Sequence, residues 1–137
     1  MNHVPINPIS LGAPSGFSNG ILCEPGKILF VAGQVGWNER HELVSSDFVE
    51  QFARALDNTV AVVRAAGGEP AHIVRLTIYV TDKNAYLAAV KEIGQRYRAL
   101  MGKHFPAMTL VEVKDLLENG AQVETDYRLA LTLSLTP

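Results

Sequence analysis

The longest strictly alternating stretch of the chain runs from Ala121 to Leu135. Successive side chains of a β-strand point to opposite faces of a sheet, so apolar residues at every second position predict a strand with one covered face. The mainly apolar set is Val123, Thr125, Tyr127, Leu129, Leu131, Leu133 and Leu135. The set between them is mainly polar: Glu124, Asp126, Arg128, Ala130, Thr132 and Ser134. We therefore expect a long strand whose leucine face is covered by helices.

Two stretches have the period of an amphipathic helix. The first begins at Asp47, which has Glu50 at the spacing of a capping box, and stops at Gly67. The second begins at Asp82, a residue suited to the N-cap, and stops at Gly102. Both carry apolar side chains along a single stripe, so both are expected to pack on the same side of a sheet.

Further strands are predicted at residues 20–24, 28–33, 73–81 and from Phe105 onward. The Pro25-Gly26 dipeptide favours a turn, so the first two strands should form a hairpin. Prolines and glycines interrupt residues 1–20, which are expected to form an irregular arm. The predicted order is β-β-α-β-α-β-β, an α+β class, in a single domain of residues 1–137.

Two helices can cover only one face of such a sheet. We expect the covered face to include the leucines of the last strand and Val74, Leu76, Ile78 and Val80. The other face is then expected to carry Arg75, Thr77, Tyr79, Met108, Leu110, Glu112, Glu124, Asp126 and Arg128. Apolar residues mixed with a few charges are typical of a subunit interface or a ligand cleft. The alternative is a monomer whose second face is simply hydrated.

Composition excludes several classes of function. The 137 residues have a formal net charge of -2, and no basic cluster is present, so nucleic acid is not an expected partner. The single cysteine, Cys23, fits a reducing compartment. We find no signal peptide and no apolar run long enough to span a membrane, so a cytoplasmic location is expected. The four histidines are scattered without other ligands at suitable spacing, and no metal site is expected.

Several short segments occur together in a characteristic order and spacing. They are Pro14 to Ser18, Ile28 to Gln34, Gln51 to Gly67, Val74 to Asp82, Phe105-Pro106-Ala107, Val111 to Val113, and Ala121 to Glu124. On these segments the chain resembles the YjgF/YER057c/UK114 superfamily, the Rid proteins, over nearly its whole length. The resemblance implies a chorismate-mutase-like α+β fold and a homotrimer with ligand clefts between subunits.

Rid proteins of the RidA type hydrolyse reactive enamines and imines to ketoacids and ammonia, with no metal or organic cofactor. The resemblance implies that Glu124 is the glutamate that positions the water and that Gly33 is the glycine that shapes the cleft. The other family positions differ here. Met108 stands at the arginine that holds the substrate carboxylate, Phe17 at a tyrosine, and Leu110 at a cysteine. The asparagine of the second helix is replaced by Val90 or Lys91.

The change at Met108 bears on the substrate. An arginine holds a carboxylate through paired charge-assisted hydrogen bonds, each worth about 1.5–3 kcal/mol, whereas methionine offers no donor. A charged 2-imino acid would lose its main anchor, on the order of a hundredfold in affinity. Arg75 is a candidate replacement for this anchor or a structural ion-pair partner.

Two functions are compatible with these residues. Glu124 could activate water as a general base, because a carboxylate in an apolar pocket has its pKa raised toward neutrality. The chain would then hydrolyse an enamine or imine other than the usual 2-imino acids. Alternatively, Glu124 pairs with Arg128 or Arg75, and the chain is a non-catalytic homotrimer that binds a metabolite or a protein.

Overall fold

The computed structural model describes residues 3–131, with side chains described up to residue 127. A four-stranded sheet lies at its centre, in the order β3-β6-β4-β5. The strands are β3 (Lys27–Gln34), β4 (Ile73–Val80), β5 (Ala107–Glu112) and β6 (Val123–Leu131). Only β4 and β5 run parallel, whereas β6 is antiparallel to both β3 and β4. The sheet is therefore mixed, and the α+β, chorismate-mutase-like fold class is confirmed.

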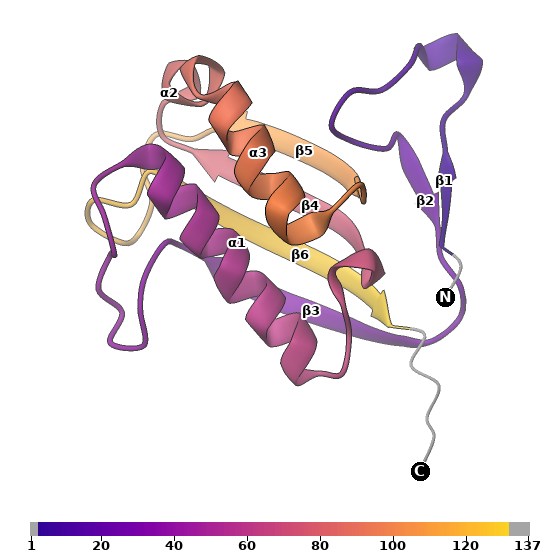
Figure 1. Ribbon diagram of the computed structural model, residues 1–137, viewed down its shortest axis with the longest axis horizontal. Helices are drawn as coiled ribbons and strands as arrows, with labels where there is room; N and C mark the ends of the chain where they lie inside the picture. The colour runs from indigo at the N-terminus through magenta and orange to yellow at the C-terminus, as the bar shows by residue number, and fades with distance from the viewer. Residues whose placement is uncertain (1–2, 132–137) are drawn as a thin grey trace.

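Helices cover one face of this sheet (Figure 1). They are α1 (Phe48–Ala65), α2 (Lys83–Ala88) and α3 (Val90–Met101), and a short 3-10 turn, Pro70–His72, leads into β4. The predicted N-caps are confirmed: the Asp47 side chain accepts from the Glu50 amide at 3.1 Å, and Asp82 caps α2. The second helical stretch is divided, because Ala89 leaves helical geometry at φ -112° and ψ 12°. It therefore forms two helices where the sequence predicted one.

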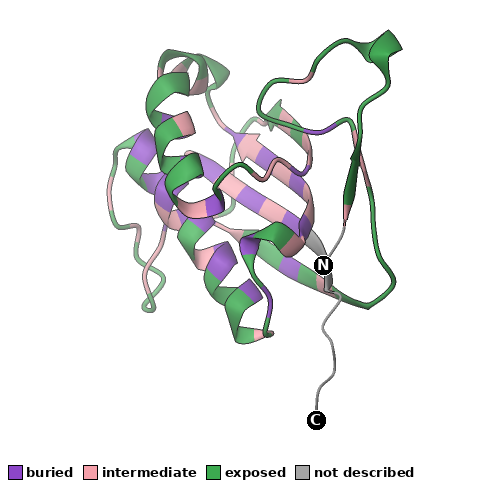
Figure 2. Cartoon of the chain, turned by 45° about the vertical axis from the view of Figure 1, so that its right-hand side comes forward, coloured by how far each residue is buried: buried purple, intermediate pink, exposed green. Residues whose placement is uncertain are grey.

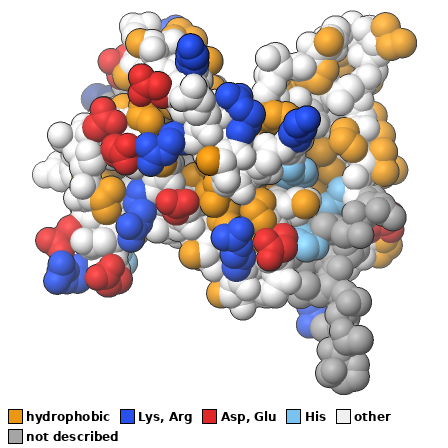
Figure 3. All heavy atoms as spheres, viewed as in Figure 1, with side chains coloured by type: hydrophobic (Ala, Val, Ile, Leu, Met, Phe, Trp, Pro, Cys, Tyr) orange, Lys and Arg blue, Asp and Glu red, His pale blue; other side chains and the backbone are white. Residues whose placement is uncertain are grey.

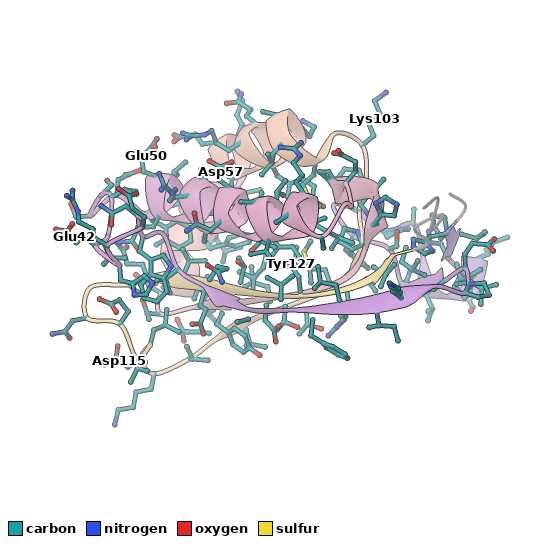
Figure 4. All side chains as sticks on the ribbon, turned by 90° about the horizontal axis from the view of Figure 1, so that it is seen from below. Glu42, Glu50, Asp57, Lys103, Asp115 and Tyr127 are labelled. Atoms are coloured by element: carbon teal, nitrogen blue, oxygen red, sulfur yellow. The ribbon has the colours of Figure 1, made fainter. Side chains whose placement is uncertain are left out.

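The core lies between the sheet and the helices α1 and α3. Figure 2 shows buried residues on the inner side of the helices, and Figure 4 shows Tyr127 between α1 and β6. The alternation of β6 is confirmed as far as it can be followed: Val123, Thr125 and Tyr127 are each 0% exposed. Residues 132–135 of the predicted run lie outside the described residues.

The central strand β4 departs from its predicted alternation at one point. Leu76, Ile78 and Val80 are buried as expected, but Ile73 is buried in place of Val74, which is half-buried. The pairing with β6 is irregular between Ile73 and Arg75. A bulge adds one residue to a strand and shifts its side chains by one position, which accounts for the exchange.

The face predicted for β5 is wrong. Met108 lies opposite Leu76, and Leu110 lies opposite Ile78, and neighbours in register share a face. Both side chains pack against the core cluster on the helix side. Glu112 is in register with Val80 on that same side, and its carboxylate accepts from the Lys83 amide at 2.9 Å. The open face therefore lacks these three residues.

The amino-terminal arm differs from the prediction as well. Its β1 (Val4–Ile6) pairs antiparallel with β2 (Gly20–Leu22), and the 3-10 turn Ile9–Leu11 lies between them. The predicted hairpin of residues 20–24 with 28–33 is therefore wrong, because β2 pairs within the arm. Figure 2 shows most of this arm exposed. Ser18 joins it to β5, with its amide on the Pro106 carbonyl at 3.0 Å and its hydroxyl on the Phe105 carbonyl at 2.6 Å.

Candidate functional site

The candidate site residues lie in two groups on opposite faces of the sheet. Glu124 is in register with Tyr79 on the face away from the helices, and Arg75 lies on that face too. Met108 and Leu110 lie on the helix side. Within one chain the sheet itself separates the two groups, so one small ligand cannot contact both.

Glu124 lies against a glycine of the neighbouring strand. A Cβ atom added to Gly33 would be 2.9 Å from the Glu124 Cδ and 3.0 Å from its Oε1. Real Cβ atoms essentially never come this close, so a larger residue at position 33 would displace the carboxylate. The β3–β6 pairing is irregular between Val31 and Gln34, at this point of the strand. The half-buried carboxylate therefore lies in space that the glycine leaves open, beside the irregular part of β3.

Arg75 has a different partner from those expected. Its Nη2 donates to the Thr109 hydroxyl at 2.6 Å, across to the edge strand β5. Among the residues whose side chains are described, Glu124 is in no ion pair. Arg75 is also on the opposite face from Met108, so within one chain it cannot take over the role of an anchor at that position.

The helix-side group borders a small hollow under the arm. The hollow has a volume of about 230 Å³ and is lined by Ser15, Gly16, Phe17, Tyr86, Met108 and Leu110. The structure thus brings together three of the four positions at which the sequence departs from the Rid pattern. A larger hollow of about 350 Å³ adjoins it and shares Met108 and Tyr86. Its wall also includes Gly94 and Arg98 of α3, which the sequence analysis did not select.

Two tyrosines on this side are affected by burial. Desolvation raises the pKa of Tyr86, which is half-buried, and raises that of Tyr97 further. The Tyr97 hydroxyl donates to the His104 carbonyl at 2.7 Å, and the His104 ring lies 2.5 Å from the Ile73 carbonyl through Nε2. These contacts hold the segment that enters β5. Both hydroxyls remain protonated hydrogen-bond donors at neutral pH.

The described residues form neither a metal site nor a membrane-spanning helix. Within residues 3–131, no group of three or more His, Cys, Asp or Glu side chains is arranged to hold a metal ion. None of the helices in the described part of the chain is long and apolar enough to cross a membrane. Cys23 is exposed, and its thiol lies 3.8 Å from the Ile21 carbonyl.

The family model described as endoribonuclease L-PSP matches residues 10–129. The chain belongs to the Rid superfamily. A solved Rid-family protein of unknown function, YyfB from Yersinia pestis, superposes with a TM-score of 0.85 at 34% identity and covers 96% of this chain and 100% of its own. This likeness extends through the arm as well as the sheet.

Relatives with assigned names are also similar. Protein DfrA of Myxococcus xanthus is 35% identical over 111 residues, which cover 80% of this chain and 81% of that protein. The 2-iminobutanoate/2-iminopropanoate deaminase of Escherichia coli is 33% identical over 94 residues, covering 66% of this chain and 70% of that one. The Rid family thus includes a deaminase at this level of similarity.

Proposed function

We propose that this Rid protein hydrolyses an enamine or imine other than the usual 2-imino acids, with Glu124 positioning the water. The observation that carries the proposal is the contact between Glu124 and Gly33. Gly33 has no Cβ, and this leaves the Glu124 carboxylate room to lie against β3, in a place that a Cβ would fill. A general base needs such positioning as much as it needs the right pKa.

The site that we propose is completed by a second copy of the chain. Glu124 and Met108 lie on opposite faces of one sheet, so a cleft that contains both must lie between two subunits. The open face also carries Ile28 and Phe30, each 67% exposed. Apolar side chains of this size beside charges are what a subunit interface would cover. A homotrimer with clefts between its subunits, as the family resemblance implies, would meet both requirements.

The chemistry needs no group beyond these side chains and water. Glu124 would accept a proton from water as the oxygen attacks the C=N carbon. Glu124 would return this proton to the nitrogen to give a carbinolamine. It would then pass the remaining hydroxyl proton to the nitrogen, so that the C–N bond breaks, ammonia leaves and the C=O bond forms. Phe17, Met108 and Leu110 would surround the substrate with apolar side chains. The substrate class that fits is therefore a neutral or apolar imine.

The test uses 2-aminoacrylate generated in situ, with its hydrolysis followed in a coupled assay. We expect the wild type to hydrolyse this charged substrate slowly. Met108→Arg should raise the rate of hydrolysis, because it places a guanidinium in the hollow beside Phe17, where it can bind the substrate carboxylate. Glu124→Gln introduced into Met108→Arg should return the rate to background. Apolar imines should be hydrolysed by the wild type and not by Glu124→Gln.

Gly33→Ala tests whether the reaction depends on where the Glu124 carboxylate lies. Its Cβ would meet the movable end of the Glu124 side chain rather than backbone, so the fold should survive while the rate falls more than tenfold. If neither the wild type nor Met108→Arg exceeds background on any imine tried, the hydrolase proposal is wrong.

The second candidate is a non-catalytic homotrimer that binds a metabolite or a protein. One observation favours it: Met108 and Leu110 pack against the core, so the region around the family's arginine position is built as an apolar wall. Under this alternative, a small molecule would bind equally well to the wild type and to Glu124→Gln, and no turnover would be detected. Although the family model is named for an endoribonuclease, a net charge of -2 does not favour RNA as a substrate.

A further inference from the structure

The larger hollow between the arm and α3 is not accounted for by the proposed hydrolysis. It has a volume of about 350 Å³, within the range of small-molecule sites. Ser15 and Gly16 border it from the arm, Ile78 and Met108 from the sheet, and α3 forms the opposite side. Within one chain, Glu124 is on the other face of the sheet and does not line this hollow.

A glycine in the middle of α3 helps to open this hollow. Gly94 lies well inside the helix, which ends at Gly102, so it serves neither as a cap nor as a stop. Glycine is the least favourable helix-interior residue after proline. We interpret its presence as keeping the volume beside position 94 free of a side chain. A Cβ at this position would lie 3.1 Å from Nη1 of Arg98. The guanidinium of Arg98 therefore lies over the place that a side chain at position 94 would occupy.

Arg98 differs from Arg96 on the same helix and from Arg64 on α1. Arg96, two residues earlier, pairs with Glu50 at 2.6 Å, and Arg64 pairs with Glu69 at 3.4 Å. No described carboxylate forms an ion pair with Arg98. Figure 3 shows basic side chains on the helices beside the hollow that separates them from the arm. A cation without a counter-ion thus lies at the margin of an apolar cavity.

A second donor faces the same space. Tyr86 lines both hollows and makes no side-chain hydrogen bond to another described residue. Its hydroxyl is protonated at neutral pH, as in any tyrosine of ordinary pKa, and burial raises the pKa further from neutrality. A guanidinium fork matches the two oxygens of one carboxylate, and a hydroxyl in the same lining is a further donor. The apolar walls, which include Phe105 and Ile93, match an uncharged tail.

We propose that the hollow between the arm and α3 binds a small apolar monocarboxylic acid, with its carboxylate on Arg98 and its tail against Met108 and Phe105. The binding requires neither Glu124 nor turnover. A neutral molecule would leave Arg98 without a counter-ion, and an amine would be repelled by it. A carboxylate lacking an apolar tail would leave the cavity walls uncovered.

Calorimetric titration with 4-phenylbutanoate and its neutral analogue 4-phenylbutan-1-ol tests this proposal. We expect the acid to bind the wild type at least tenfold more tightly than the alcohol. Arg98→Gln should lower the affinity for the acid at least tenfold. Arg96→Gln removes the same charge from the same helix, away from the hollow, and should bind as the wild type does.

Variants at position 94 test the cavity itself. Gly94→Leu should keep the helix, since leucine is a good helix former, and should abolish binding by filling the hollow. Gly94→Ala should narrow the hollow only slightly and reduce affinity less than Gly94→Leu does. Circular dichroism and thermal unfolding confirm that each variant is folded.

Three results would overturn the proposal: equal affinity for the acid and the alcohol, equal effects of Arg98→Gln and Arg96→Gln, or no heat of binding to the wild type. Glu124→Gln separates this site from the proposed reaction. It should bind 4-phenylbutanoate unchanged, so a loss of hydrolysis with binding retained leaves this inference standing. Amide chemical-shift changes in the complex should centre on Gly16, Gly94 and Met108, and a centre at Glu124 would contradict it.

Discussion

The two faces of the sheet are made by the same strands but are completed in different ways. On the helix side, Leu76, Val80 and Tyr127 are fully buried beneath the helices. On the other side, Phe30 and Ile28 remain 67% exposed, beside Glu124, Thr77 and Arg75. Figure 4 shows side chains of the open face pointing away from the helices. The helix-covered face buries its apolar side chains within a single chain. The open face has the composition of a surface that another subunit would cover.

The residues that stabilise the fold therefore lie on one face, and Glu124, to which we assign a function, lies on the other. Residues of the covered face should control stability, and residues of the open face should control assembly and reactivity. Each of the following measurements tests that division.

Leu56→Ala should have the largest effect. Leu56 lies on the inner side of α1 at 1% exposure, and truncation of a buried leucine costs about 2–5 kcal/mol in the free energy of unfolding. Urea denaturation measures the change. Val62→Ala, on the outer side of the same helix at 37% exposure, should change stability by less than about 1 kcal/mol. Equal losses would show that burial does not distinguish the two sides.

Phe30→Glu should act on assembly. Size-exclusion chromatography with light scattering should give a wild-type mass about three times the 14.9 kDa of one chain. The variant places a charge in the apolar part of the open face and should elute as a single chain with its helical signal retained. Val62→Glu adds the same charge to the helix side and should leave the mass unchanged. A wild type that elutes as one chain would refute the trimer.

Tyr127→Phe should have the smallest effect on the free energy of unfolding, and it should raise this free energy where Leu56→Ala lowers it. The Tyr127 hydroxyl is buried and makes no hydrogen bond to any described residue, and burial raises its pKa well above the ordinary value. Removal of such a hydroxyl should raise stability by up to about 1 kcal/mol. Tyr97→Phe, which removes a donor to the His104 carbonyl, should lower it by about 0.5–1.5 kcal/mol. Thermal unfolding of both variants compares the two, and a loss on Tyr127→Phe would indicate an additional partner.

The sequence was informative where its pattern was strong. The alternation in β6 and the caps at Asp47 and Asp82 each depend on local chemistry, and the structure confirms them. Gln51 has a polar side chain of the kind that an amphipathic helix usually turns toward solvent, yet it is fully buried. Its amide donates to the Ser45 and Gly120 carbonyls and accepts from the Gln122 amide. Such a set of partners depends on the fold and leaves no periodic signal.

The face of β5 could not be predicted from its own residues. Both sets of alternate positions in Ala107–Glu112 mix polar with apolar side chains, so neither is marked as the buried one. Only the register with β4 places Met108 against the core. The pairing of β2 fails for a similar reason, because three residues carry too little pattern to select between β1 and β3. As a result, the sequence identified the candidate site residues but not their division between two faces.

The contact of Ser18 with the start of β5 bears on how copies of this chain can associate. Ser18 pairs in parallel with Ala107, so the arm occupies part of the outer edge of the sheet. Exposed edge strands invite another chain to add a strand, and such addition has no natural end. With this edge partly blocked, copies that meet through the open face would be directed toward closed, finite assemblies. Removal of the arm would then expose a route to fibre-like growth.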